Sequence, residues 1–219
     1  MTQIKVFSNI MRSNENMAKK NRELFARYKI PVINMMSSPG SGKTSLLEKT
    51  VSHYEGKMRI AVLEGDLQTD RDAQRIGKYG IQVAQINTDG ACHLDANMVN
   101  KALSAFDLKQ IDLFFIENVG NLVCPAGFDL GEAWRVNLVS IPEGDDKVIK
   151  YPVIFRKCDL MFVNKIDLLP YIQYDLPRLK KEALNIRADM KIIEASCLTD
   201  QGMDHWYQWL QTLVNRTDV

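Results

Sequence analysis

The stretch SSPGSGKTS (residues 37–45) places the tightest constraint on what this chain can fold into. It follows the short apolar run PVINMMSS (31–38), which is typical of a buried strand, and a helical segment is expected from about Lys43. A glycine-rich loop between a strand and a helix is the setting of a Walker A loop, which binds nucleotide phosphates. We therefore predict a P-loop nucleotide-binding fold.

Apolar and helical segments alternate along the rest of the chain. We expect strands at 59–65, 82–86, 112–118, 136–141, 159–165 and 191–196, and helices near 70–79, 94–105, 177–187 and 203–214. This alternation predicts right-handed crossovers and an α/β fold, the three-layer P-loop NTPase fold with a mostly parallel central sheet. Residues 1–30 are expected to form a leading helical segment, and residues 31–219 a single P-loop domain.

The bulk composition excludes several classes of partner. The 219 residues carry a formal net charge of +1, which gives no electrostatic reason to expect binding to nucleic acid or to a membrane surface. The apolar runs are shorter than the ~18 residues that a membrane span needs, and the N-terminus does not resemble a secretory signal. We expect a cytoplasmic protein, in which the four cysteines are thiols or metal ligands rather than disulfides.

The loop residues have separate expected roles in phosphate binding. Lys43 would reach the β- and γ-phosphates, and Thr44 would offer its hydroxyl to Mg²⁺. Ser37 takes the place of the first glycine of the Walker A pattern, a small change because serine is also small. The predicted phosphate-binding residues are Gly40, Ser41, Gly42, Lys43, Thr44 and Ser45.

The sequence NKID, at the end of a later apolar strand, indicates which base is bound. Asp167 can accept hydrogen bonds from both the ring N–H and the exocyclic amino group of guanine. Asn164 would brace the loop, and the stem of Lys165 could lie over the base. The turn SCL, with Ser196 and Cys197, stands where GTPases have a SAK-like turn, and the backbone N–H of Cys197 can serve the base as alanine does. An ATP-dependent protein stays the alternative if NKID arises by chance.

Two strand ends carry acidic residues toward the γ-phosphate end of the predicted site. Asp66 ends one strand in EGDLQTD, and Glu117 ends another in ENVG, where ordinary GTPases have a DxxG switch. With Thr44 these carboxylates are the candidate ligands of Mg²⁺, and Gly120 could donate its N–H to the γ-phosphate. Lys43, Asp66 and Glu117 are the predicted catalytic residues. Neither a water-orienting glutamine nor an arginine finger is evident, so slow hydrolysis is expected.

A second metal site is suggested by Cys92, His93 and Cys124. Thiolates and imidazole suit Ni²⁺, Zn²⁺ or Cu⁺ rather than Mg²⁺. The spacing is a weak signal, because it contains neither a CxxC nor an HxxxH pair and free cysteine is often simply buried. If these cysteines are core residues, the chain is a GTP-binding regulatory switch that does not deliver metal.

Six motifs in order resemble the HypB family of GTPases, which help to insert nickel into nickel–iron hydrogenase. The motifs are SSPGSGKTS, EGDLQTDRDA, GACHLDA, ENVGNLVCPAGFDLGE, SIPEGDDKVIKYP and NKIDLLPY. The resemblance covers nearly the whole chain from about residue 30. It implies the dimerising class of P-loop GTPases, which is related to the urease nickel chaperone UreG.

This resemblance implies a metal-handling function. Cys92, His93 and Cys124 match the family's metal-binding residues at a dimer interface, with GTP or GDP, Mg²⁺, and Ni²⁺ or Zn²⁺ as ligands. The implied partners are a second copy of the chain in a GTP-promoted homodimer, a HypA-like metallochaperone and the hydrogenase large subunit. Residues 1–30 contain neither Cys nor His, so we expect metal delivery and not storage.

The resemblance leaves one close alternative and suggests one mechanism. A UreG-like GTPase for urease maturation would favour a Cys-Pro-His motif, whereas Cys124 and Pro125 are followed here by Ala126.

Cys124 stands seven residues beyond Glu117. We therefore expect that a turn sensing the γ-phosphate also moves a metal ligand.

Overall fold

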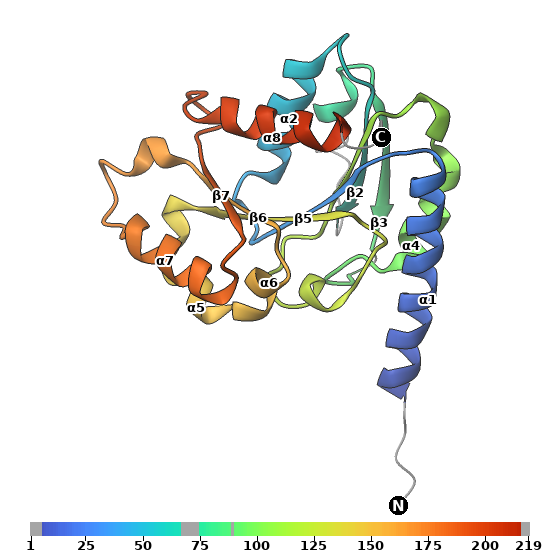
Figure 1. The fold of residues 1–219 in the computed structure, drawn as a ribbon, viewed down its shortest axis with the longest axis horizontal. Coiled ribbons are helices and arrows are strands. Elements are labelled where there is room, and N and C mark those ends of the chain that lie inside the picture. The colour runs from blue at the N-terminus through green and yellow to red at the C-terminus, as the bar shows by residue number, and fades with distance from the viewer. Residues whose placement is uncertain (1–5, 67–74, 89, 216–219) are drawn as a thin grey trace, which may run out of the picture.

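The structure is a computed structural model that describes residues 6–66, 75–88 and 90–215, without the side chains of residues 6–10 and 66. Within these ranges seven strands form one sheet in the order β3-β2-β4-β1-β5-β6-β7, and all neighbouring strands are parallel (Figure 1). The strands are β1 (Val32–Ser37), β2 (Ile60–Asp66), β3 (Gln82–Asn87), β4 (Leu113–Glu117), β5 (Trp134–Ser140), β6 (Leu160–Asn164) and β7 (Lys191–Glu194). The helices are α1 (Val6–Arg27), α2 (Lys43–Tyr54), α4 (Ala96–Ala102), α5 (Lys147–Lys150), α6 (Pro152–Arg156), α7 (Leu176–Ile186) and α8 (Met203–Asn215).

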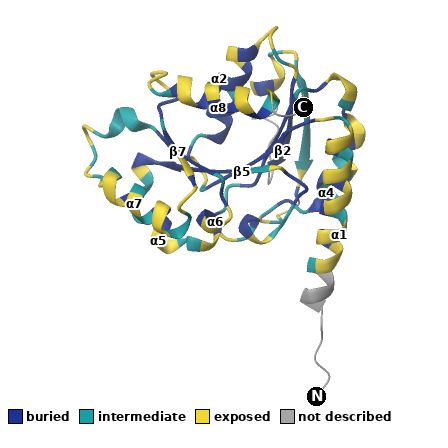
Figure 2. Cartoon of the chain, in the orientation of Figure 1, coloured by how far each residue is buried: buried dark blue, intermediate teal, exposed yellow. Residues whose placement is uncertain are grey.

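Helices cover both faces of the sheet and give the three layers that the sequence predicts. Helices α2 and α8 lie on one face, while α5, α6 and α7 lie on the other, with α1 and α4 near β2 and β3 (Figure 1). Strands β1, β4 and β6 are buried along their whole length, which is why they read as continuous apolar runs (Figure 2). The central core packs Trp206 of α8 and Leu46 of α2 against Phe115 and Phe162 of the sheet.

Strand order places the functional loops together. β1 lies between β4 and β5, with β2, β3 and β4 on one side of it and β5, β6 and β7 on the other, so the chain changes sides between β4 and β5. Ligands of open parallel sheets bind beyond the carboxyl ends of the strands at such a switch point. The loops after β1, β2, β4, β5 and β6 all leave from that edge because the strands are parallel.

The leading helix α1 packs onto the domain through a few buried polar contacts. The side-chain amide of Asn21 donates to the carbonyl oxygens of Ala96 and Leu130, each at 2.9 Å. Phe25 packs its ring 5.3 Å from that of Phe114 in β4. A Cβ at Gly131 would come within 2.6 Å of Asn21, so the loop before β5 approaches the helix closely.

The predicted elements agree with the structure to within a few residues, with some differences. β5 begins at Trp134, two residues before its predicted start, and the helix predicted over 94–105 ends at Ala102 and continues as a 3-10 turn, Leu103–Ala105. Helices α5 and α6 were not predicted, because each is short and Pro152 separates them. Much of the helix predicted near 70–79 lies outside the described residues.

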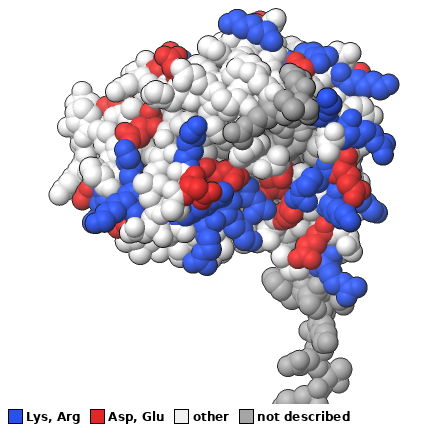
Figure 3. Space-filling model, viewed as in Figure 1, with Lys and Arg blue, Asp and Glu red and all other residues white. Residues whose placement is uncertain are grey.

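The surface carries charges of both signs. Lys and Arg side chains lie beside Asp and Glu side chains across the face shown in Figure 3, as the net charge of +1 leads one to expect. Among the described helices, none combines the length and apolar character needed to cross a membrane.

Candidate functional site

The phosphate loop joins β1 to α2 at the carboxyl edge of the sheet. β1 ends at Ser37, and α2 begins at Lys43. Gly40 and Gly42 have φ angles of +77° and +102°, in the left-handed region that favours glycine. A Cβ at Gly42 would also lie 2.4 Å from Nδ2 of Asn164. The first backbone N–H groups of α2 have no carbonyl partner within the helix, so this loop can bind an anion.

Lys43 is buried against the end of β1. Its Nζ donates a hydrogen bond to Oγ of Ser37 at 2.8 Å, and that hydroxyl donates to the carbonyl oxygen of Ser38 at 2.5 Å. The serine in the place of the first Walker A glycine therefore orients the lysine. Ser45 lies half-buried on the first turn of α2.

The turn after β4 contacts the phosphate loop directly. Thr44 donates its hydroxyl to Oε1 of Glu117 at 3.0 Å, and both residues are buried. A Cβ at Gly120 would lie 3.0 Å from the backbone N and Cα of Pro39, so this turn packs against the loop. Asp66 ends the neighbouring strand β2 at the same edge, and its side chain lies outside what the structure describes.

Asn164 connects the phosphate loop with the predicted base-binding segments. Its Nδ2 donates to the carbonyl oxygen of Ser41 at 2.8 Å. Its Oδ1 accepts from the backbone N–H groups of Lys165 at 2.8 Å and Cys197 at 3.2 Å. Lys165 has a φ of +62° and donates from Nζ to the carbonyl oxygen of Gly40 at 2.8 Å. One buried side chain thus brings three separate loops together.

Asp167 has a buried carboxylate oxygen that is free to accept a hydrogen bond. Its Oδ1 is buried and has no hydrogen-bond partner among the described residues, an arrangement that costs free energy unless a ligand supplies the donor. Ser196 accepts from the N–H groups of Leu198 at 3.2 Å and Thr199 at 3.1 Å, which shapes the neighbouring turn. Burial raises the pKa of the Cys197 thiol to about 12, consistent with a structural role for this side chain. The buried Oδ1 of Asp167 can therefore accept a hydrogen bond from a bound ligand.

The structure brings Cys92, His93 and Cys124 together. Each of the three offers one ligand atom, and these atoms all lie within 4.8 Å of one another. Sγ of Cys92 is 3.6 Å from Nδ1 of His93, and the His93 ring packs 3.9 Å from that of Phe128. Cys92 is exposed, and the other two are half-buried. The cluster therefore stands at the surface, where a metal ion can enter and leave.

Hydrogen bonding and burial shift the pKa values of two of the three cluster residues. The pKa of the Cys92 thiol is raised, chiefly by its hydrogen bond with Cys124 and also by partial desolvation. Burial lowers the pKa of His93, against the opposing effect of Asp95, which favours the neutral imidazole that can bind a metal ion. A metal ion would have to displace the thiol proton of Cys92.

Glu143 is a site residue that the sequence reading missed. Its Oε2 accepts hydrogen bonds from Oγ of Ser41, Oγ of Ser140 and the backbone N–H of Ser140, each at 2.8 Å. It therefore holds the phosphate loop against the end of β5. The capping-box spacing of Ser140 and Glu143 in SIPEG is the sequence signal that could have found it.

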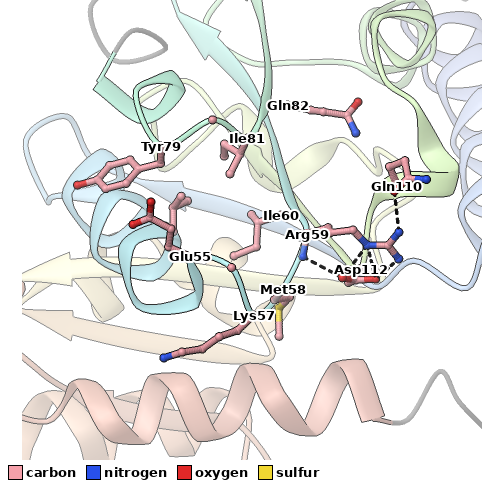
Figure 4. Close-up of a pocket in the computed structure, with 13 residues that line it drawn as sticks. Glu55, Lys57, Met58, Arg59, Ile60, Tyr79, Ile81, Gln82, Gln110 and Asp112 are labelled. Atoms are coloured by element: carbon pink, nitrogen blue, oxygen red, sulfur yellow. Dashed lines mark hydrogen bonds and ion pairs between the residues drawn. The ribbon is translucent and has the colours of Figure 1, made fainter.

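A hollow of about 580 Å³ lies at the opposite, amino edge of the sheet (Figure 4). Arg59 and Asp112 form hydrogen bonds along its wall, and Glu55 and Tyr79 lie across from them. None of the predicted site residues lines this hollow. The candidate site is therefore the loop-built carboxyl edge and not this cavity.

Comparisons with known proteins find relatives of similar sequence and fold. A family model described as "CobW/HypB/UreG, nucleotide-binding domain" matches residues 31–194. The hydrogenase maturation factor HypB of Azotobacter vinelandii is 45% identical over 208 residues, which cover 95% of this chain and 69% of the relative. The hydrogenase/urease maturation factor HypB of Helicobacter hepaticus is 44% identical over 197 residues, covering 88% of this chain and 81% of the relative. A crystal structure of HypB from Helicobacter pylori in complex with nickel has a TM-score of 0.88 and 36% identity, covering 93% of this chain and 96% of that one.

Proposed function

The chain belongs to the CobW/HypB/UreG family of nucleotide-binding proteins, and from this premise we propose that it is a GTP-hydrolysing metallochaperone. It binds nickel at the Cys92, His93 and Cys124 cluster and delivers the metal during maturation of nickel–iron hydrogenase. The observation that carries this proposal is the meeting of these ligands within 4.8 Å of one another, beside the turn that follows Glu117. The name of the A. vinelandii relative and the nickel complex of the H. pylori protein support it.

The nucleotide half of the function follows from the phosphate loop. Lys43 and the N–H groups at the start of α2 stabilise negative charge on the β- and γ-phosphates as the bond to the γ-phosphorus breaks. Asp167 accepts from guanine, and Asn164 holds the base loop against the phosphate loop. Thr44, Asp66 and Glu117 would hold Mg²⁺, which supplies charge neutralisation when bound.

The metal half follows from the surface position of the cluster. Three ligands leave coordination positions open, so an ion bound by one protomer can complete its shell with ligands of a second copy or of a recipient. We propose that GTP promotes a homodimer at this surface, and that hydrolysis releases the ion. A HypA-like metallochaperone and the hydrogenase large subunit are the proposed partners, in the cytoplasm.

Urease maturation is the second candidate function. The H. hepaticus relative carries both hydrogenase and urease in its name, so a chain of this kind can be associated with either enzyme. Both candidates share the nucleotide and metal chemistry and differ in the recipient apoenzyme.

Phosphate release and metal content test the proposal together. We expect slow hydrolysis of GTP and none of ATP, and one nickel ion per cluster that is lost in Cys92→Ser. The matched control is Cys158→Ser, because Cys158 is a fully buried cysteine two residues before the amino end of β6, whereas the cluster loops follow the carboxyl ends of their strands. Equal nickel content in wild type and Cys92→Ser, or equal hydrolysis of ATP and GTP, would contradict the proposal.

A further inference from the structure

The segment between Glu117 and Cys124 contains two asparagines that bind the loop of Cys92 and His93. Oδ1 of Asn118 accepts from the backbone N–H of Leu94 at 3.1 Å, 24 residues earlier in the chain. Nδ2 of Asn121 donates to the carbonyl oxygen of Cys92 at 3.3 Å. The nucleotide-side turn is thus hydrogen-bonded to the backbone on both sides of His93.

Hydrogen bonds with β1 hold the side-chain amide of Asn118 in one orientation. Its Nδ2 donates to Oδ1 of Asn34 at 3.3 Å, and Nδ2 of Asn34 donates to Oε1 of Glu132 at 3.2 Å. The backbone N–H of Asn118 donates to the carbonyl oxygen of Met35 at 3.0 Å. Asn118 is 1% exposed and Asn34 is fully buried. Because its donors and acceptors are matched, the amide cannot turn without breaking bonds in this network.

Leu94 is tightly packed against the end of β2. Its side chain is fully buried, and a Cβ at Gly65 would lie 2.7 Å from its Cγ and 2.8 Å from its Cδ1 and Cδ2. Gly65 directly precedes Asp66 at the end of β2. Leu94 directly follows His93, so a shift of its peptide N–H moves the imidazole.

We propose that Asn118 is a positioning residue that transmits the state of the Glu117 turn to Cys92 and His93. This inference rests on the proposed function. Cys124 follows the turn along the chain, whereas Cys92 and His93 belong to a segment on the other side of the cluster. The Asn118–Leu94 hydrogen bond makes Cys92 and His93 move together with Cys124.

The test compares nickel affinity in two nucleotide states. Nickel is titrated into protein bound to GDP and into protein bound to a non-hydrolysable GTP analogue, and the ratio of the two dissociation constants is recorded. We expect a ratio of ~10 or more in wild type and a ratio within ~2 of unity in Asn118→Ala, because the link is cut. Asn118→Asp keeps an oxygen acceptor for the Leu94 N–H and should retain most of the wild-type ratio.

Asn100→Ala is the matched control. Asn100 also joins two elements through its amide, since it donates from α4 to Oδ1 of Asn21 in α1 at 2.8 Å, and neither helix contains a cluster residue or the turn after Glu117. The ratio of nickel dissociation constants in Asn100→Ala should equal the wild-type ratio. A loss of stability alone would change both dissociation constants together and leave their ratio unaltered.

The outcomes separate the inference from the proposed function. A wild-type ratio of ~10 that persists in Asn118→Ala would overturn the role of Asn118 and leave the metallochaperone standing. A wild-type ratio of unity would overturn both. If Asn118→Ala does not fold, hydrogen exchange of the Leu94 amide in wild type decides the question. We expect different protection in the two nucleotide states, and equal protection would overturn the inference.

Discussion

Thr44 and Glu117 share a buried hydrogen bond of 3.0 Å, although they lie on different elements 73 residues apart. Thr44 belongs to the phosphate loop helix, and Glu117 ends the strand whose following turn leads to Cys124. This bond places the expected magnesium hydroxyl against the carboxylate that begins the path to the metal cluster. In the proposed function, this hydrogen bond would link the nucleotide site to the nickel site.

Replacement of Glu117 should impair hydrolysis more than folding. Glu117→Gln keeps the shape of the side chain but removes the charge that faces Thr44. Loss of a carboxylate that orients a metal ligand typically costs ~10- to 100-fold in activity. We therefore expect kcat for GTP to fall by that factor. Single-turnover phosphate release would measure it. Glu55→Gln, at the opposite edge of the sheet, should behave as wild type. Equal rates in Glu117→Gln and wild type would remove Glu117 from the catalytic set.

Replacement of Asp167 should change the base that is bound. Asp167→Asn puts an amide donor where guanine also presents donors, and it loses a charge-assisted hydrogen bond worth ~1.5–3 kcal/mol, which corresponds to at least about tenfold in affinity. Xanthine has a carbonyl in place of the amino group and should bind the variant better than guanine. Competition of GDP and xanthosine diphosphate against a fluorescent nucleotide would show the exchange. Unchanged preference for GDP would mean that NKID does not contact the base.

The four cysteines should react at very different rates. Thiolates are the reactive species, and burial raises the pKa values of Cys158 and Cys197 to about 12. In folded protein at pH 8, iodoacetamide should therefore modify Cys92 and Cys124 and spare the buried pair. Ni²⁺ should slow both reactive cysteines by at least ~10-fold, because a metal-bound thiolate is no longer free to attack. Mass spectrometry of the labelled peptides would measure this, with protein unfolded in guanidinium as the control. A Cys124 rate that nickel leaves unchanged would exclude it as a ligand.

The ion pair of Asp112 with Arg59 predicts a pH dependence of stability. The hydrogen bond from Arg59 holds the pKa of Asp112 below its ordinary value (Figure 4). A lowered carboxyl pKa stabilises the fold above the unfolded pKa of ~3.9, and this contribution is lost as the pH falls through the folded value. Asp112→Asn should lower the urea midpoint equally at pH 7 and pH 5, and the difference should shrink toward pH 3. A difference that stays constant down to pH 3 would contradict this assignment.

The strands and the phosphate loop were predictable from the sequence for a physical reason. A parallel sheet is buried on both faces, so β1, β4 and β6 appear as apolar runs, and glycines mark the loop that the phosphates require. Because all carboxyl ends lie at one edge, the proximity of Lys43 to Asn164 could also be expected. The short helices α5 and α6 were not predicted, because four or five residues are too few to show a helical repeat of apolar residues.

Contacts between distant loops were harder to predict. Cys92 and Cys124 are 32 residues apart, and they lie in the loops after β3 and β4, two strands that both pair with β2. The Asn34–Asn118 hydrogen bond was not predicted either, and the sequence signal that could have pointed to a buried polar contact is the asparagine inside the apolar run PVINMMSS.

Nickel titration of the wild-type protein, with the oligomeric state recorded in the same samples, tests the link between nucleotide and metal most directly. Coupling between two ligands is reciprocal, so nickel must change the affinity for the GTP analogue by the same factor that the analogue changes the affinity for nickel. We predict a factor of ~10 or more, about 1.4 kcal/mol, accompanied by dimer formation with the GTP analogue. Equal nickel affinity in the GDP and GTP-analogue states would contradict a nucleotide-controlled metal switch.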